Sequence, residues 1–463
     1  MSIRHVVIIG NGVAGFAAAR QLRRQDGDLT ISILSDEAHP FYLRSRLKEF
    51  ICSALDEHEM ILESRNLYRR EKLNLLLQTR VAALDTVNRE VILERGERIR
   101  WDRLLLAMGC RPQPLEMPGG DLRGVFSLRT LGDAQAIRNW AQGRRRAVVL
   151  GEGVVSLQLA ESLACAGLEV DYLLLGDRLW PEVLDETAGG ILEYLLRDAG
   201  VRIHKRSRVV AIHAAAGDVR AVELEDGREW PCDLVGHGCS FRPATEILVN
   251  TAIACRDGVV VDPHLETSVH GIFAAGDVVG REEAREDGAL GPFRWQNSFH
   301  QGEVAARNIL GAEEVLETFS FGIRTELCDL GVAVLGHGNL STKAAGVTVD
   351  QVRHENHYRR LVFQDEILVG AILLGDVEHA PMLEEHIRRG ATRGELHETL
   401  LPALLDEEPR LEQPLETHCP ICTDAVKLAA GTLIGHRFSC RSCGNKLRLT
   451  YSEGRLAVLP EEE

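Results

Sequence analysis

Short apolar runs followed by helix-like segments recur along the first 300 residues. An apolar run at 6–9 leads into a glycine-rich turn and a helical pattern at 16–23, and a second apolar run at 147–150 leads into a similar turn and helix. Buried strands that alternate with helices are typical of doubly wound sheets with parallel strands. The pattern therefore predicts an α/β fold with two units of this kind.

Both turns carry the glycine spacing of a dinucleotide-binding site. The first has its glycines at Gly10, Gly12 and Gly15. The second keeps Gly151 and Gly153 but has Ser156 where the third glycine belongs. The three glycines allow a tight turn, close approach of the backbone to a pyrophosphate, and close packing of helix on strand. Two such turns, each between a strand and a helix, predict two dinucleotide sites.

The order of these patterns divides the chain into domains. A further buried strand ends in AAGD at Asp277, which suggests that the first domain resumes after the second. Residues 310–395 have the pattern of a small α/β domain, and the acidic, proline-broken stretch 402–416 is typical of a linker. We expect a first domain at 1–118 and 247–309, a second at 119–246, a third at 310–395, a linker at 396–416 and a small module at 417–463.

Composition narrows the function classes. The 463 residues carry a net charge of -16, which argues against a nucleic-acid partner. No apolar run approaches the ~20 residues of a membrane span. The N-terminus enters a strand at once, without the pattern of a signal peptide. The 11 cysteines are therefore expected as reduced thiols in a cytoplasmic protein.

The order of the motifs GNGVAG, FYLR, LLLAMG, GEGVVS, AAGDV, W-x-N and VGAILLGD resembles that of flavoproteins with two dinucleotide domains. The resemblance covers residues 1–395 and is to the branch of NADH-dependent rubredoxin reductases and the flavin portion of NAD(P)H nitrite reductases. It implies FAD in the first domain and a nicotinamide in the second. It also implies a redox protein partner of the iron–sulfur or rubredoxin type.

The resemblance also implies which side chains contact FAD. Asp36, with Glu37 as the alternative, would hold the ribose, Arg44 would approach the isoalloxazine, and Asp277 would bind the ribityl and phosphate side. The remaining implied contacts are Val81 beside the adenine, Ala107 and Gly109 at a strand end, Arg129, and Trp295 and Gln296 closing the flavin. Arg129 fits an interdomain salt bridge equally well, and Trp295 also fits a core or interface position because large aromatic side chains bury area.

No cysteine pair suits dithiol chemistry beside the flavin. Cys52 and Cys110 each stand alone, whereas disulfide reductases of this superfamily carry two closely spaced cysteines. A solitary buried cysteine behaves as a small apolar residue. The sequence therefore argues against glutathione or thioredoxin reductase activity.

The second domain departs from the family at the nicotinamide site. Gln158 replaces a glutamate that the family pairs with a lysine near the reacting atoms, and Lys48 stands one position from the usual place of that lysine. Leu174 stands where NAD enzymes have an acid for the ribose, and only Arg178 is available for a 2′-phosphate. These changes predict weak, altered or absent nicotinamide binding. The alternative is a tolerant site that still binds NAD through its pyrophosphate.

The C-terminal module carries four cysteines at zinc-site spacing, C-x2-C-x17-C-x2-C. They are Cys419, Cys422, Cys440 and Cys443. A module this small needs a metal to fold, because its apolar core is too small. The spacing resembles zinc ribbons and predicts structural Zn²⁺, with a rubredoxin-like iron site and disulfides as the alternatives.

Two functions follow from these observations. The first is an FAD-dependent oxidoreductase that transfers electrons between a nicotinamide and a redox protein. The second is an FAD electron-transfer subunit that has lost nicotinamide use and docks in a larger complex through its zinc ribbon. Intact counterparts of Leu174 and Gln158 would have favoured the first.

Overall fold

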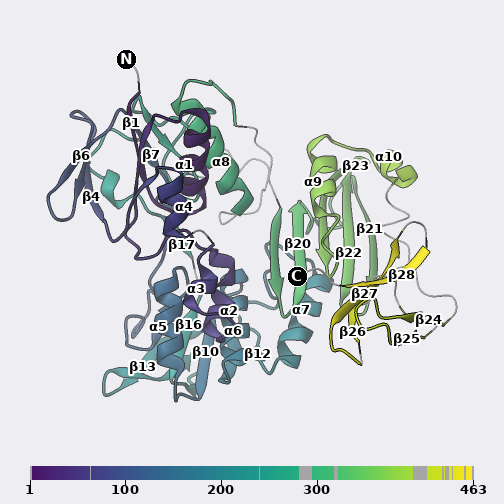
Figure 1. The fold of residues 1–463 in the computed structure, drawn as a ribbon. Coiled ribbons are helices and arrows are strands. Elements are labelled where there is room, and N and C mark those ends of the chain that lie inside the picture. Colours follow the sequence, from purple (N-terminus) through teal and green to yellow (C-terminus); the bar gives the residue numbers. More distant parts are fainter. Residues whose placement is uncertain are drawn as a thin grey trace.

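The computed structural model describes residues 3–62, 64–238, 240–280, 295–316, 322–399, 414–429, 432, 437–440, 442–452 and 455–460. The chain forms two sheet-and-helix domains, a third domain beside them and a small β module (Figure 1). The predicted α/β class is confirmed. No helix among the described residues is long and apolar enough to cross a membrane.

The first domain is built on a parallel sheet of strand order β18-β7-β1-β2-β3. Its strands are β1 (His5–Ile9), β2 (Thr30–Leu34), β3 (Asn74–Leu76), β7 (Arg103–Leu106) and β18 (Ile272–Ala274). Helix α1 (Val13–Gln25) packs against α8 (Trp295–Ile309) on one face, burying alanines and Phe16. Because β18 lies in the same sheet as β1, residues around Asp277 return to the first domain after the second has been completed.

Smaller elements complete the first domain. An antiparallel sheet contains β4 (Val81–Asp85), β5 (Glu90–Leu93) and β6 (Arg98–Arg100). The helical elements between β2 and β3 are η1 (Arg44–Arg46), α2 (Leu47–Ile51), α3 (Glu57–Met60) and α4 (Arg65–Arg70), and η2 (Glu246–Leu248) lies near β4. A two-stranded ribbon of β8 (Cys110–Pro112) and β17 (Phe241–Pro243) joins the first and second domains.

The second domain repeats the parallel arrangement with strand order β12-β11-β10-β16-β9. Its strands are β9 (Val125–Ser127), β10 (Arg146–Leu150), β11 (Glu169–Leu173), β12 (Arg202–His204) and β16 (Leu234–His237). The helices are α5 (Leu131–Ala141), α6 (Val154–Cys165) and α7 (Glu186–Asp198), and a small antiparallel sheet contains β13 (Val209–Ala215), β14 (Asp218–Leu224) and β15 (Glu229–Pro231).

The third domain is an antiparallel sheet of order β19-β20-β23-β22-β21 that carries two helices. Its elements are β19 (Ile323–Leu327), β20 (Leu330–Gly336), β21 (Val347–His354), β22 (His357–Gln364), β23 (Ile367–Leu374), α9 (Ala380–Arg388) and α10 (Arg393–Thr399). One sheet face packs under α9, and residues of the other face, such as Val332 and Ile372, share a core with the second domain. The third domain is thereby fixed to the second domain.

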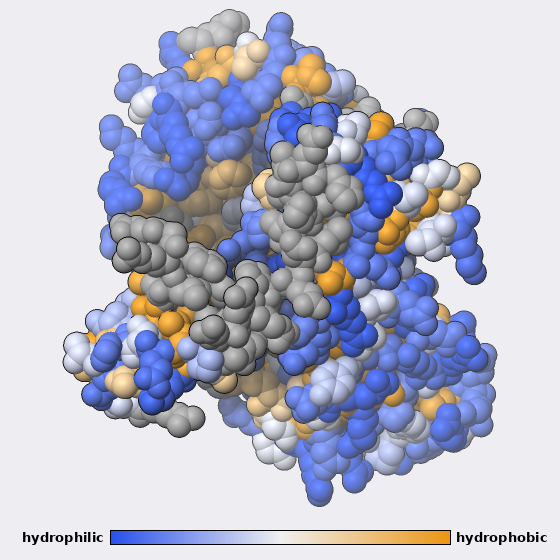
Figure 2. All heavy atoms as spheres, turned by 90° about the vertical axis from the view of Figure 1, so that its right-hand side faces the viewer, coloured by the Kyte–Doolittle hydropathy of each residue, from blue (hydrophilic) through white to orange (hydrophobic). Residues whose placement is uncertain are grey.

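The C-terminal module consists of two small antiparallel sheets. They contain β24 (Leu415–His418) with β25 (Ala425–Leu428), and β26 (Arg437–Ser439) with β27 (Lys446–Ser452) and β28 (Arg455–Pro460). Arg448 of β27 lies 3.3 Å from Glu378 of the third domain. Figure 2, which looks toward the third domain and this module, shows a mostly hydrophilic face with hydrophobic residues in separate small groups.

Two segments predicted from the sequence, the linker and a surface loop, lie partly or wholly outside the described residues. The expected linker begins at residue 396, but α10 continues to Thr399 and β24 already starts at Leu415. The helical pattern of RGELHET was missed because the segment is only 7 residues long. The rest of that linker, and the loop expected at 281–291, lie outside the described residues.

Candidate flavin and nicotinamide cleft

One cleft of about 790 Å³ is lined by the first glycine turn, by the Asp277 segment and by β19 of the third domain. From the second unit, Val154, Val155 and Gln158 of α6 line it, whereas Gly151, Gly153 and Ser156 do not. The described residues that line it include Gly10, Val154, Gln158, Asp277 and Thr325. Both turns follow the central strand of a parallel sheet, which is where such sheets bind nucleotides. The cleft is large enough for ligands well above fragment size.

The first glycine turn has the geometry that a pyrophosphate requires. Gly10 has φ +111°, and a Cβ there would lie 2.1 Å from the carbonyl oxygen of Ala107. A Cβ on Gly15 would lie 2.0 Å from the carbonyl oxygen of Gly10. Gly12, by contrast, faces open space at the N-terminus of α1. Backbone N–H groups at a helix N-terminus bind phosphate, so this turn fits FAD.

Asn11, which the sequence analysis did not single out, adds a polar group to this turn. Its Oδ1 accepts a hydrogen bond from the Tyr68 hydroxyl at 3.1 Å. Its buried Nδ2 has no hydrogen-bond partner among the described residues, and Asn11 is one of the residues that line the cleft. A buried donor without a partner is costly unless a ligand or water accepts from it. The residue at this variable position of the motif carried no signal in the sequence.

The two acids after β2 differ in their partners. Both oxygens of Glu37 are engaged, one by the Tyr42 hydroxyl at 2.5 Å and the other by Arg44 Nη2 at 2.6 Å. Asp36 is half exposed on the cleft wall, 3.6 Å from Arg111. The carboxylate of Asp36 is thus the more available of the two for a ribose.

Arg44 connects the cleft wall to the second domain. Besides its bonds to Glu37 and Tyr42, its Nη1 donates to the carbonyl oxygen of Arg129 at 2.7 Å. The Tyr42 hydroxyl in turn accepts from the backbone N–H of Leu131. Arg44 lines the cleft, as expected, and is held there by a network rather than by a single contact.

Asp277 and Arg129 form an ion pair at 2.9 Å on the cleft wall. Cys110 donates to the same carboxylate over 3.6 Å. Burial, with Asp277 beside it, raises the pKa of Cys110 to about 12, so this sulfur stays a protonated thiol at neutral pH. Arg129 therefore forms the salt bridge that the sequence allowed and lines the cofactor cleft as well.

The remaining expected FAD contacts also line the cleft. They are Val81 at the start of β4, Ala107 and Gly109 after β7, and Trp295 and Gln296 at the start of α8. Trp295 is 43% exposed and its ring stacks on that of Phe299, so it is neither a core residue nor fully buried. No further cysteine besides Cys110 lines the cleft among the described residues.

The second glycine turn accommodates Ser156 through a matching glycine. Gly151 has φ +110°, nearly the value of Gly10. The buried Ser156 hydroxyl donates to the Leu150 carbonyl at 2.8 Å and accepts from the N–H of Gly238 at 3.0 Å. A Cβ on Gly238 would lie 2.6 Å from the Ser156 backbone nitrogen. Gly153 caps α6 and faces open space, so the phosphate-facing side of the turn is preserved.

Gln158 and Lys48 do not pair with each other. Gln158 Nε2 donates to Thr325 Oγ1 at 3.2 Å, which joins α6 to the third domain at the cleft wall. Lys48 instead forms a buried ion pair with Glu161, at 2.9 Å. Burial raises the pKa of Glu161, and the Lys48 ammonium partly opposes that rise.

His237, another residue that the sequence analysis missed, ends β16 at the cleft. It is 4% exposed, and its Nδ1 has no hydrogen-bond partner among the described residues. Burial lowers the pKa of His237 to about 4, so the ring is neutral at pH 7. A histidine inside an apolar strand gives no periodic signal that would mark it as a cleft residue.

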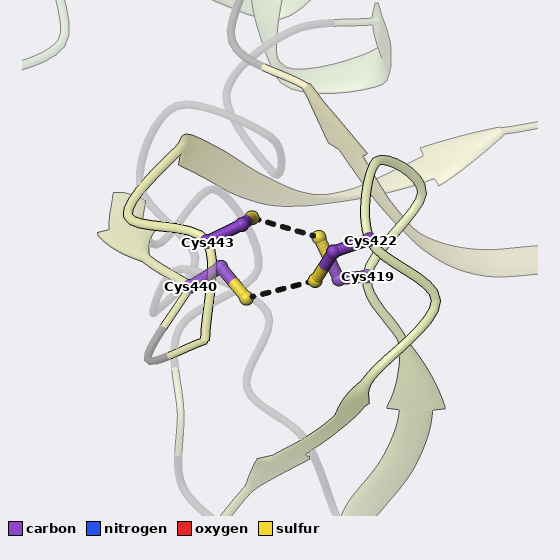
Figure 3. Close-up of side chains that lie close together, drawn as sticks. All are labelled: Cys419, Cys422, Cys440 and Cys443. Carbon is purple, nitrogen blue, oxygen red and sulfur yellow. Dashed lines mark hydrogen bonds between the residues drawn. The ribbon is translucent and has the colours of Figure 1, made fainter.

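The four ribbon cysteines converge from two knuckles (Figure 3). Their sulfurs all lie within 4.8 Å of one another, with Cys419–Cys443 at 3.8 Å and Cys422–Cys440 at 3.6 Å. A tetrahedral zinc site with Zn–S bonds of about 2.3 Å requires sulfurs about 3.8 Å apart. Hydrogen bonds from Asn445 lower the pKa of Cys443 to about 6, which favours its thiolate.

Each knuckle turn has a residue with positive φ directly after its second cysteine. Gly444 has φ +74°, and its N–H donates to the Cys440 carbonyl at 2.8 Å. Thr423 occupies the equivalent place in the first knuckle with φ +62°. The donor set of four thiolates fits one metal ion with no open position.

Comparisons with known proteins agree with this geometry. Residues 4–302 match the family described as pyridine nucleotide-disulphide oxidoreductase, and residues 325–391 match the rubredoxin NAD+ reductase C-terminal domain. The ferredoxin–NAD(+) reductase component of the biphenyl dioxygenase system of Paraburkholderia xenovorans (strain LB400) is 36% identical over 306 residues. That alignment covers 66% of this chain and 74% of the relative.

A longer alignment and a solved structure extend the match. Nitrite reductase [NAD(P)H] of Bacillus subtilis (strain 168) is 27% identical over 415 residues, covering 88% of this chain but only 50% of that protein. The crystal structure of a ferredoxin reductase from Rhodopseudomonas palustris has a TM-score of 0.77 at 24% identity, over 87% of this chain and 97% of that one, and so supports the fold. The chain belongs to the pyridine nucleotide-disulphide oxidoreductase family of FAD-dependent NAD(P)H oxidoreductases, and its third domain matches the C-terminal domain of rubredoxin NAD+ reductases.

Proposed function

We propose that this chain takes a hydride from a reduced nicotinamide onto FAD and passes single electrons to a small iron–sulfur or rubredoxin-type protein. The observation that carries the proposal is the single cleft in which the first turn, Asp277, Val154 and Gln158 all meet. Hydride transfer needs two stacked rings in one site more than it needs acid–base groups. When bound, FAD would supply the step from two-electron to one-electron chemistry.

The chain's own residues would bind and orient the cofactors. The turn at Gly10 to Gly15 would hold the FAD pyrophosphate, and the Asp277–Arg129 pair would fix the middle of the cofactor. Val154, Gln158 and Thr325 form the wall on the nicotinamide side. The hydrogen bond between Gln158 and Thr325 keeps that wall in place. Cys110, a protonated thiol, would take no part in electron transfer.

Two observations support a redox protein as the electron acceptor: the described part of the cleft has no cysteine pair, and the relatives include ferredoxin reductases. The described cleft residues include no cysteine pair, so the described site has no dithiol that could reduce a disulfide substrate. The relatives include ferredoxin reductase components, and one solved relative is a putidaredoxin reductase–putidaredoxin complex. A one-electron protein acceptor is therefore the simplest assignment for this chain.

The ribbon would hold one structural Zn²⁺. Four converging thiolates leave no open coordination position for a substrate, so the metal would stabilise the module rather than react. The core around the site is small, with Leu447 and Leu449 as its fully buried members. A module with so little core depends on metal binding for its folding free energy.

Anaerobic reduction tests the function directly. The purified holoprotein is titrated with NADH and NADPH while the flavin absorbance is followed, and a ferredoxin or a rubredoxin is then added. We expect bleaching by a nicotinamide and reoxidation by the iron protein. If dithionite bleaches the flavin but neither NADH nor NADPH does, the result would favour the electron-transfer subunit that does not use a nicotinamide.

A further inference from the structure

The end of β11 lacks the acid that usually holds the adenosine ribose of NAD. Leu174, at that position, is fully buried in the core that the second and third domains share. Its backbone N–H donates to the His204 carbonyl, which continues the sheet pairing past the strand end. Leu174 therefore offers nothing to a nucleotide at this edge of the sheet.

A different carboxylate reaches the same place. Glu152, the middle residue of the G-x-G turn, accepts a hydrogen bond through Oε1 from the backbone N–H of Gly176, two residues beyond Leu174. A Cβ on Gly176 would lie 3.1 Å from this oxygen, so the carboxylate uses space that a glycine leaves open. The Glu152 carbonyl also accepts from the N–H of Trp180, at 2.9 Å. The loop after β11 is thus fastened to the glycine turn around the Glu152 side chain.

We propose that Glu152 replaces the missing strand-end acid and binds the adenosine ribose hydroxyls of NADH. In a doubly wound domain, the ribose of a nucleotide held by the glycine turn lies just outside the end of the second strand, where the Glu152 carboxylate stands. A carboxylate has about four acceptor sites, and the N–H of Gly176 uses one of them. The inference rests on the proposed function, since it names which nicotinamide that function uses.

The charges around this position favour NADH over NADPH. The Glu152 carboxylate would repel a 2′-phosphate on the ribose. Arg206 is paired with Asp177, and Lys205 with Glu193 at 2.8 Å, so both neighbouring cations already face a carboxylate. Arg178, exposed in the same loop, is a third cation near Asp177. A single exposed arginine beside the Asp177 carboxylate makes a poor site for a phosphate dianion.

Binding of nucleotide fragments tests the role of Glu152 apart from catalysis. ADP-ribose and its 2′-phosphorylated analogue are titrated calorimetrically into the FAD-loaded full chain, as wild type and as the variants Glu152→Gln and Glu152→Ala. Glu169→Gln, at the opposite end of β11, is the matched control. Flavin content and melting temperature establish that each variant is folded.

We expect the wild type to bind ADP-ribose at least tenfold more tightly than the 2′-phosphorylated analogue. Glu152→Gln and Glu152→Ala should each weaken ADP-ribose binding about tenfold and reduce the preference to within threefold, because a charged hydrogen bond is lost. The control should change neither value. Unchanged ADP-ribose binding in the folded variants would overturn the inference. Tighter binding would also overturn it, because it would show that Glu152 obstructs the site. If discrimination follows Glu152 but NADH leaves the flavin oxidised, the assignment of Glu152 stands and the proposed function fails.

Discussion

The ammonium group of Lys48 lies 2.9 Å from Glu161 Oε1, three residues beyond Gln158 on α6. Lys48 and Glu161 are 7% and 15% exposed, so the pair is largely withdrawn from water. It joins α2 of the first domain to α6 of the second. Gln158 is thereby left to bond Thr325 at the cleft wall. Gln158 has no charge to pair with Lys48, and the acid that does pair with Lys48 stands one turn further along the helix.

Glu161→Gln should lower the free energy of unfolding by about 3 kcal/mol, because it leaves the buried Lys48 without its partner charge. Thermal unfolding of the holoprotein measures the effect. Glu326→Gln is the matched control, since Glu326 is 60% exposed and 3.9 Å from the same ammonium, and it should cost less than about 1 kcal/mol. The double variant Lys48→Met, Glu161→Leu should recover much of the loss. Equal effects of the Glu161 and Glu326 substitutions would contradict this account.

Asp277→Ala should strip FAD from the protein. The change removes a carboxylate that Arg129 holds on the cleft wall, and losing one charged hydrogen bond of about 1.5–3 kcal/mol weakens binding roughly 10- to 100-fold. The ratio of flavin to protein absorbance after gel filtration checks this. Asp121→Ala, at an exposed position, should retain its flavin. A fully loaded, yellow Asp277→Ala protein would refute the role of Asp277.

His237 should make stability depend on pH below neutrality. Because burial lowers its pKa from 6.5 to about 4, the unfolded chain binds a proton in this interval that the folded chain does not. The titration of His237 therefore leaves the free energy of unfolding unchanged above pH 6.5. That free energy falls by roughly 3 kcal/mol in all as the pH drops from 6.5 toward 4. Comparing melting temperatures of wild type and His237→Asn across pH 4–7.5 isolates the effect. Parallel curves for the two proteins would show that His237 does not titrate this way.

The ribbon should contain one zinc ion per chain. Elemental analysis of the purified protein measures the zinc content, and Cys443→Ser should reduce that content because it removes one of four thiolate ligands.

Deleting residues 417–463 should leave FAD bound while weakening association with the redox partner. Iron with a rubredoxin-like visible spectrum would instead make this module an electron carrier.

The sequence predicts well the parts of the site that depend on backbone geometry. The positive φ of Gly10 and Gly151 and the close approach of Ala107 to Gly10 require glycine, so the motif itself reports the turn. Four cysteines at ribbon spacing likewise imply that their sulfurs converge, as they do. In both cases the chain has almost no other way to satisfy the local constraint.

Side chains that reach across the fold could not be placed in this way. Glu152 meets Gly176 over 24 residues of sequence, and Lys48 meets Glu161 over 113. Leu174 at the strand end indicates that the acid for the ribose is missing. The motif spacing does not show that a residue of the preceding turn fills that position. Asn11 and His237 were missed for a similar reason, since burial beside a cleft depends on packing between elements.

The reduction of the flavin by NADH tests the central claim most directly. The holoprotein is mixed anaerobically with NADH or NADPH, and the flavin absorbance is recorded over a range of concentrations. The account predicts complete bleaching by NADH, at a half-saturating concentration at least tenfold lower than for NADPH. Flavin that remains oxidised with both nucleotides, yet is bleached by dithionite, would contradict it.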